Sequence, residues 1–400
     1  MATSIDGSMM RRLNKTAVFR TIYEGSPISR AEIASSLGMN KATASSLVDE
    51  LIAEHFVMEL GYGESRGGRK PMMLDLNKTS GYSIGIDVQI THITAALCDL
   101  SGTILHLHRD ALYVRPDASA KERLVQQLES VIRRTMALAP PSPHGIIGVG
   151  IAFPGMVNSS TGQIHYLPNL EVHDWSVHRD LVARLQIPIF VDNDANCGAL
   201  AERQQRGLKQ LAFINAGIGI GVGIIANGEL YRGQDGISGE FGHTTIAAMG
   251  LRCSCGSYGC WEQYASERAL LRYLEEGGTC HIPPFPSANF LEECVLRADA
   301  GDPHYIRAFQ TVGQHIGYGL SNVINGLNPG YVIIGGNLAS AARHIMNEVE
   351  NVVSYRAVSV NRNVQIVIAD PSTVVSGAAS LVISSMLLVD VDSLADIRSV

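Results

Sequence analysis

The sequence lacks the features that mark membrane, secreted and disordered proteins. No apolar run reaches about 18 residues, the length at which a membrane-spanning helix is expected. The N-terminus lacks the basic-then-apolar layout of a secretory signal, so we expect a cytoplasmic protein. Only 17% of the 400 residues are charged and 46% are hydrophobic, a balance typical of packed domains. The length predicts two or three such domains.

A strong net charge is also missing, but the charges are unevenly distributed. The whole chain carries −7. Residues 1–80 contain 10 Lys and Arg against 9 Asp and Glu, whereas the remainder contains 21 against 29. The N-terminal segment is therefore at +1 and the rest at −8. This distribution is compatible with nucleic-acid binding by the N-terminal segment alone.

Cysteine is scarce, with seven residues in the chain, yet three of them lie within eight positions. With a histidine ten residues upstream they form a candidate metal site of His243, Cys253, Cys255 and Cys260. Three thiolates and an imidazole are a donor set that structural zinc takes in a closed tetrahedral site. The alternatives are unpaired cysteines in a loop or a disulfide, which a reducing compartment disfavours. We expect zinc.

The first 80 residues contain the pattern of a small DNA-binding domain. Apolar spacing predicts a first helix over Arg11–Tyr23. A second helix over Arg30–Leu37 begins at a capping box formed by Ser29 and Glu32. Asn40 caps a third helix, whose outer face is small and polar. Two short helices joined by a tight turn predict a helix-turn-helix, with an ordinary three-helix bundle as the alternative.

Two alternating segments, Phe56–Leu60 and Met72–Leu76, predict strands that flank a glycine-rich basic loop. Such a hairpin is typical of a wing, whose cations contact phosphates or enter the minor groove. A solvated basic loop is the alternative. Residues 1–80 are therefore predicted to form a winged helix-turn-helix. Its candidate DNA contacts are Asn40, Lys41, Ala42, Thr43, Ser45 and Ser46 in the recognition helix, and Arg66, Arg69 and Lys70 in the wing.

From Tyr82 onward the chain has the pattern of an α/β body. Apolar segments such as Tyr82–Val88, Gly145–Phe153 and Tyr331–Ile334 predict buried strands. An amphipathic helix is predicted over residues 119–138, and a last helix near residues 376–388. Strands that alternate with helices in this way predict a mixed α/β architecture.

Gly239–His243, the cysteine cluster and Trp261–Glu262 together resemble the signature of the ROK family of bacterial sugar kinases and sugar-responsive repressors. The order of head, wing and body resembles the repressor branch, because the plain kinases lack the head. The resemblance implies a two-lobed actin-like ATPase fold with a ligand cleft between the lobes. It divides the body into a first lobe of residues 81–190, completed by a C-terminal helix at about 376–400, and a second lobe of residues 191–375 that carries the zinc loop.

Six positions match those at which this family contacts sugar hydroxyls. Hydroxyls both donate and accept, so a fixed set of Asn, Asp and Glu side chains can satisfy them and reject ligands that lack one. A zinc-bound imidazole would have one ring nitrogen left for a hydroxyl. Taken singly, Asn169 and Glu262 are more often turn or capping residues. The resemblance implies sugar contacts at Asn169, Asn193, Asp194, Glu240, His243 and Glu262.

The loops that hold ATP phosphates in the family's kinases are altered in this chain. The first reads Asp-x-Gly-Gly-Thr in the family, whereas Asp87–Thr91 reads Asp-Val-Gln-Ile-Thr and lacks both glycines. The second, normally Gly-Thr-Gly, reads Gly-Ile-Gly at 217–219. Because phosphoryl transfer depends on positioning and electrostatics, we expect a protein that is not an enzyme. Asp194 would then serve as a sugar hydrogen-bond acceptor. The alternative is an active sugar kinase with a regulatory head.

The sequence therefore predicts a sugar-responsive transcriptional repressor that binds operator DNA. No cluster of Arg or Lys stands among the candidate sugar contacts, which favours a free neutral sugar as the effector. A homodimer, or a dimer of dimers, would present two heads to a pseudo-palindromic operator. Control by a protein partner, as in some members of the family, is a further alternative.

Overall fold

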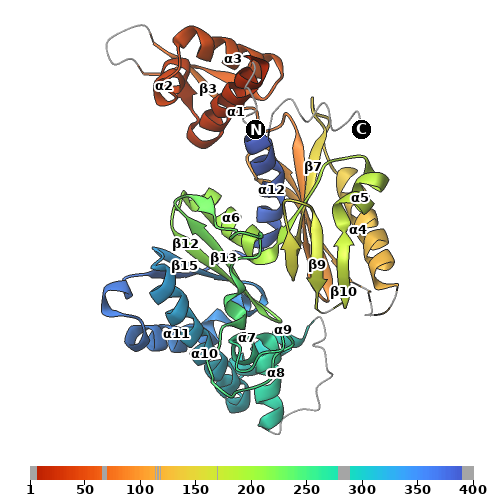
Figure 1. Cartoon of the computed structure of the whole chain (residues 1–400), viewed down its shortest axis with the longest axis vertical. Coiled ribbons are helices and arrows are strands. Elements are labelled where there is room, and N and C mark those ends of the chain that lie inside the picture. Colours follow the sequence, from red (N-terminus) through yellow and green to blue (C-terminus); the bar gives the residue numbers. More distant parts are fainter. Residues whose placement is uncertain are drawn as a thin grey trace.

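The structure, a computed structural model, describes residues 7–64, 70–112, 114, 117, 119–168, 170–277 and 289–389. A small N-terminal unit sits on one of two larger α/β lobes (Figure 1). Each lobe is built around a five-stranded sheet. None of the described helices combines the length and the apolar character that crossing a bilayer requires.

The N-terminal unit combines three helices with a three-stranded sheet of order β1-β3-β2. The predicted capping box is confirmed, since Ser29 accepts from the Glu32 N–H and Glu32 accepts from the Ser29 N–H at 2.9 Å. Asn40 caps the third helix by accepting the Ala42 N–H at 2.8 Å. The elements are α1 (Gly7–Gly25), β1 (Ile28–Ser29), α2 (Arg30–Ser36), α3 (Lys41–Ala53), β2 (Val57–Tyr62) and β3 (Met72–Leu76).

The core of the N-terminal unit continues into the first lobe. Val18, Phe19 and Ile22 of α1 belong to the same buried apolar cluster as Val382 and Ile383 of α12 (Thr373–Val389). Apolar area removed from water stabilises by about 25 cal/mol per Å². The N-terminal unit is therefore held against the first lobe by packing as well as by the chain connection.

The first lobe has the sheet order β11-β7-β4-β5-β6, in which β11, β7 and β4 are parallel. Helices α4 and α5 share one apolar cluster with this sheet, and α12 packs against the sheet as well. Strand β11 continues to Asn193, beyond the expected lobe boundary at residue 190. The bounds are β4 (Tyr82–Val88), β5 (His92–Asp99), β6 (Ile104–Ala111), α4 (Ala120–Met136), β7 (Ile146–Phe153), α5 (Val177–Leu185) and β11 (Ile189–Asn193).

A second, smaller sheet of the first lobe was absent from the sequence expectations. Its order is β10-β9-β8, with antiparallel pairing throughout. The strands are β8 (Met156–Asn158), β9 (Gln163–Leu167) and β10 (Val172–Ser176). Strands of three to five residues are too short to carry a clear periodic signal. The sheet places Tyr166 at the mouth of the cleft described below.

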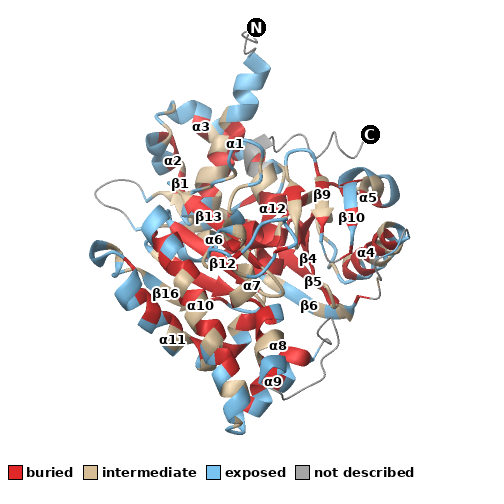
Figure 2. Cartoon of the chain, turned by 60° about the horizontal axis from the view of Figure 1, so that its bottom comes forward, coloured by how far each residue is buried: buried red, intermediate tan, exposed pale blue. Residues whose placement is uncertain are grey.

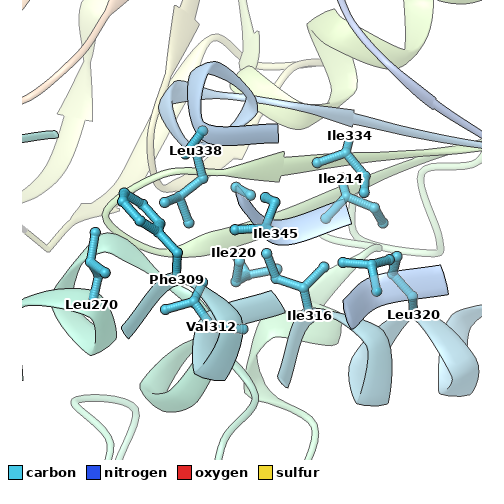
Figure 3. Packing of buried hydrophobic residues seen from close by; sticks show 14 of the residues in the cluster. Ile214, Ile220, Leu270, Phe309, Val312, Ile316, Leu320, Ile334, Leu338 and Ile345 are labelled. Atoms are coloured by element: carbon cyan, nitrogen blue, oxygen red, sulfur yellow. The ribbon is translucent and has the colours of Figure 1, made fainter. Parts of the chain in front are cut away.

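The second lobe has the sheet order β14-β13-β12-β15-β16. Its sheet and helices bury many residues (Figure 2), which form one apolar cluster. In Figure 3, Ile214 and Ile334 of the sheet face Val312 and Ile316 of α10. The bounds are β12 (Leu211–Ala216), β13 (Ile220–Ala226), β14 (Glu229–Leu230), η1 (Glu240–His243), α7 (Glu262–Ala265), α8 (Glu267–Glu276), α9 (Phe290–Asp299), α10 (Pro303–Leu327), β15 (Tyr331–Gly335), η2 (Asn337–Ala341), α11 (Ala342–Arg356), η3 (Ser359–Asn361) and β16 (Gln365–Ile368).

Helix α6 (Asp194–Arg206) joins the two lobes. It packs on β12 and β13 of the second lobe and on α12 of the first. The approach to α12 is so close that a Cβ atom on Gly377 would lie 1.8 Å from the carbonyl oxygen of Cys197. Only glycine fits there, so the two helices form a tight junction between the lobes.

Candidate functional site

A cleft of about 310 Å³ contains most of the predicted sugar contacts. Residues of the first lobe line one side, among them Gln89, Pro154, Tyr166 and Pro168, and residues of the second lobe line the other. Asn169 lies outside the described residues. The predicted sugar contacts that line the cleft are Asn193, Asp194, Glu240, His243 and Glu262.

Asp194 is the most buried acid among the residues that line the cleft, with 6% of its surface exposed. Burial and the nearby Asp87 raise its pKa to about 7, against hydrogen bonds from the Ala195 N–H and the Asn215 side chain. The Ala195 N–H lies 2.8 Å from Oδ1. On one side Asp194 therefore accepts hydrogen bonds from the protein, and its other side faces the cleft.

Asn193 has a mainly structural set of hydrogen bonds. Its Oδ1 caps α6 by accepting the N–H groups of Ala195 at 2.9 Å and Asn196 at 3.4 Å. Its Nδ2 donates to the Gly155 carbonyl at 3.1 Å. A side-chain amide has two N–H donors, so one remains for a ligand. Asn193 thus positions its neighbour Asp194 and can offer a single donor to the cleft.

The four predicted metal ligands are brought together at the edge of the same cleft. One donor atom from each of His243, Cys253, Cys255 and Cys260 lies within 4.8 Å of the others. Cys255 Sγ is 3.6 Å from Cys260 Sγ, and Cys253 Sγ is 3.6 Å from His243 Nδ1. A tetrahedral zinc with Zn–S bonds of about 2.3 Å holds its sulfur ligands roughly 3.8 Å apart. The donor set and the spacings fit a metal ion of this kind.

The cysteine cluster and the acidic cleft residues share His243. Its Nδ1 faces Cys253 Sγ, while its Nε2 lies 3.8 Å from Glu240 Oε2. Glu262 Oε1 lies 3.2 Å from Cys253 Sγ. Burial and the charge of Glu262 raise the pKa of Glu240, against His243. Any ion held by the cysteines would therefore orient the side chains that face the cleft.

In the altered first phosphate loop, two side chains of the loop are hydrogen-bonded to each other. Gln89 Nε2 donates to Asp87 Oδ1 at 2.7 Å, and both Gln89 and Ile90 line the cleft. In the second loop, the Gly217 N–H already donates to the Gly219 carbonyl at 3.0 Å. A phosphate cradle needs free backbone N–H groups that point at the ligand. The Gln89 N–H donates to the His92 carbonyl at 2.9 Å, so in each loop a backbone N–H that could hold a phosphate already has a partner within the protein.

Three site residues were missed at the sequence level. Arg232 pairs with the buried Asp192 at 2.6 Å and so connects the second lobe to β11 of the first. Arg268 lines the cleft and was not among the candidate contacts. Glu267 is buried beside the Gly217 loop, and burial raises its pKa to about 7. Single charged residues after a turn carry no motif, so only the fold reveals them.

The predicted DNA contacts of the third helix lie on an accessible face. Asn40, Lys41, Ala42, Thr43 and Ser46 are exposed, and Ser45 is half-buried. Lys70 is also exposed. Arg66 and Arg69 lie outside the described residues. The opposite face of the helix forms an apolar stripe, in which Ala44, Leu47, Val48 and Leu51 are buried.

The fold and the site define a class: a two-lobed α/β protein with a polar cleft and a Cys₃His cluster beside it, which carries an additional N-terminal unit. Comparison with known proteins identifies the family. The ROK family model matches residues 83–385, and the chain belongs to this family.

Two kinds of relatives resemble the chain. A xylose repressor of Bacillus spizizenii is 36% identical over 354 residues, which cover 88% of this chain and 89% of that protein. A crystal structure of a ROK family transcriptional regulator, a homologue of the Escherichia coli Mlc protein, aligns with a TM-score of 0.78 and 24% identity over 98% of this chain and 100% of the other. A ROK glucokinase of Streptomyces griseus in complex with glucose and AMPPNP has a TM-score of 0.65 and 27% identity, and matches 75% of this chain and 99% of the kinase.

Proposed function

We propose that the protein is a sugar-responsive transcriptional repressor whose ROK body binds a sugar and does not phosphorylate it. The observation that carries this proposal is that one cleft combines candidate sugar-binding acids with an altered phosphate loop. The acids that suit a polyol are in place, whereas Gln89 is hydrogen-bonded to Asp87 where the kinases have glycine. The repressor named above also matches nearly the full chain, while the glucokinase matches 75% of it. We propose D-xylose as the effector.

The N-terminal unit is proposed to be a winged helix-turn-helix domain of residues 1–80. Its capped helices α2 and α3, the exposed N-terminal face of α3 and the β2–β3 hairpin support this assignment. The two lobes are proposed to be residues 81–190 with 376–400 and residues 191–375, a division that falls within β11. A homodimer or dimer of dimers would place two such heads on a pseudo-palindromic operator. The Cys₃His cluster is proposed to hold one zinc ion.

The identity of the effector is tested by thermal denaturation with a panel of free sugars. A ligand that binds only the folded state stabilises it by about 2.7 kcal/mol when present at 100 times its Kd. D-Xylose is expected to raise the melting temperature more than D-glucose or N-acetylglucosamine at equal concentration. A panel in which no free sugar shifts the transition would contradict the proposed function.

Lys70→Ala tests the wing. Lys70 is exposed at the base of the basic loop, so its loss should remove about one phosphate contact. Operator affinity is expected to fall, and the slope of log affinity against log salt should become shallower by about one unit. Lys209→Ala removes an exposed lysine of the second lobe and should change neither quantity. Identical behaviour of the two variants would show that the wing does not touch DNA.

Helix α6 offers a direct route from the cleft to the N-terminal unit. Its first residue, Asp194, lines the cleft. Near its other end, Gln204 donates to the Tyr23 hydroxyl of α1 and accepts from Ser380 of α12 at 2.8 Å. A second link joins Arg20 of α1 to Glu229 of β14 at 3.1 Å. A sugar that shifts α6 therefore shifts contacts made by α1.

Tyr23→Phe tests this route, because it removes the hydroxyl that accepts from Gln204 and keeps the aromatic ring. A hydrogen bond contributes about 0.5–1.5 kcal/mol, so the factor by which sugar weakens operator binding should shrink by about 2–10-fold. Operator affinity without sugar should stay within about twofold of the original. Tyr355→Phe is the matched control, because Tyr355 is an exposed residue of α11. If Tyr23→Phe keeps the full sugar response, the Gln204 contact does not transmit it.

A further inference from the structure

Glu267 places a carboxyl group against the second glycine loop of the cleft. Its backbone N–H donates to the Gly217 carbonyl at 2.8 Å, which fixes the start of α8 against this loop. A Cβ atom built on Gly217 would lie 3.7 Å from Glu267 Oε1, which is ordinary van der Waals contact. Gly217, Ile218 and Gly219 themselves line the cleft. The carboxyl is thus separated from the cleft by little more than the loop backbone.

This carboxyl is buried and incompletely satisfied. The residue is 4% exposed, and its Oε1 has no hydrogen-bond partner within the described part of the chain. Burial raises the pKa of Glu267 to about 7, against a hydrogen bond from the Asn337 side chain. An acceptor oxygen of this kind favours neighbours that donate hydrogen bonds and disfavours further acceptors.

Two further acids lie near this loop, since a Cβ atom on Gly219 would lie 3.0 Å from Glu262 Oε2 and one on Gly221 would lie 3.7 Å from Asp194 Oδ1. Asp194 lines the cleft and is buried, and Asp87 lies close enough to raise its pKa. Among the described lining residues, Arg268 is the only Lys or Arg. Arg268 is exposed, so water and salt screen its charge far more than that of the buried carboxyls. A phosphate at the 217–219 loop would therefore meet acceptors and negative charge.

We propose that Glu267 is a specificity-determining residue whose carboxyl makes this end of the cleft reject phosphorylated ligands. The inference rests on the proposed function and deepens it by naming a residue that keeps phosphorylated ligands out of the same cleft. Phosphate exclusion then has two causes, the altered loop residues and Glu267, and substitutions can separate them. Gln89 acts through the first loop, whereas Glu267 acts through the second.

The experiment compares anion binding by charge-neutral and charge-retaining variants. Glu267→Gln and Glu267→Ser remove the carboxylate, and Glu267→Asp retains it. The probes are AMPPNP and pyrophosphate, measured by calorimetry at pH 7.5, with D-xylose as the uncharged reference. Removing a like charge beside the loop should tighten both anions by at least about tenfold in the neutral variants. The wild type and Glu267→Asp should bind both anions weakly.

Two neutral variants are made in case one of them does not fold. A cooperative thermal transition shows that a variant is folded, and one folded neutral variant is enough to test the role of Glu267. Equal anion affinity in all four proteins would overturn the proposal and assign phosphate exclusion to the loops alone. Tighter binding of glucose 6-phosphate than of any free sugar by the wild type would overturn it as well. A wild type that binds no free sugar contradicts the proposed function instead, and the anion comparison then still decides the role of Glu267.

Discussion

Replacing Cys260 by serine is expected to abolish stoichiometric zinc binding and to weaken sugar binding at the same time. Cys260 is fully buried, and its Sγ lies 3.6 Å from that of Cys255. A hydroxyl is a far poorer zinc ligand than a thiolate, so metal affinity should fall by at least about 100-fold. We expect about one zinc ion per chain in wild-type protein purified without chelator, and only a trace in the variant.

The accompanying loss of sugar binding follows from His243. This residue has one ring nitrogen toward Cys253 and the other toward Glu240, so an unanchored loop misplaces the acids of the cleft. Structural zinc also contributes to folding, and the melting temperature should therefore fall. Cys98→Ser is the matched control, since Cys98 is a buried cysteine of β5 outside the cluster. Wild-type protein that is metal-free, fully folded and sugar-responsive would contradict the zinc assignment.

Asp194→Asn is expected to separate sugar binding from DNA binding. The replacement is nearly isosteric, but it adds an NH₂ group beside the Ala195 N–H and the Asn215 side chain that now donate to the carboxylate. A buried mismatch of this kind costs about 1–3 kcal/mol. Affinity for the cognate sugar should therefore fall by about 5–150-fold.

Operator affinity of Asp194→Asn in the absence of sugar should hardly change, because residue 194 lies in the cleft and the proposed DNA contacts lie in α3 and the wing. Calorimetry measures the first quantity and an operator-binding titration the second. Asp302→Asn is a suitable control, since Asp302 caps α10 and Asn caps equally well. Normal sugar sensing by Asp194→Asn would show that this carboxylate does not contact the effector.

The parts of the fold that the sequence predicted are those governed by local chemistry. The Ser29–Glu32 capping box and the Asn40 cap are set within a few residues, and both are present. The cysteine cluster is likewise compact in sequence, apart from His243. Because His243 lies only ten positions before Cys253, spacing was still enough to predict that the four side chains would converge.

The parts that could not be predicted depend on contacts between distant segments. Tyr23 and Gln204 are 181 positions apart, and nothing in either neighbourhood indicates the other. Glu267 follows a turn like many helix-starting acids, and only the packing of α8 against the Gly217 loop makes it exceptional. Asn193 shows another limit, since capping α6 and bonding the Gly155 carbonyl use most of the hydrogen bonds of this predicted sugar contact.

The central claim is that this ROK body senses a sugar and controls DNA binding without phosphoryl transfer. The most direct measurement titrates an operator, selected from a random-sequence DNA pool, with the wild-type protein in the presence and absence of D-xylose. A parallel assay of the same preparation measures ATP turnover with that sugar. We predict a sugar-induced change in operator affinity of about 5–150-fold and no turnover above background. Turnover at typical kinase rates of about 1–100 per second, or an operator affinity that no free sugar changes, would contradict the account.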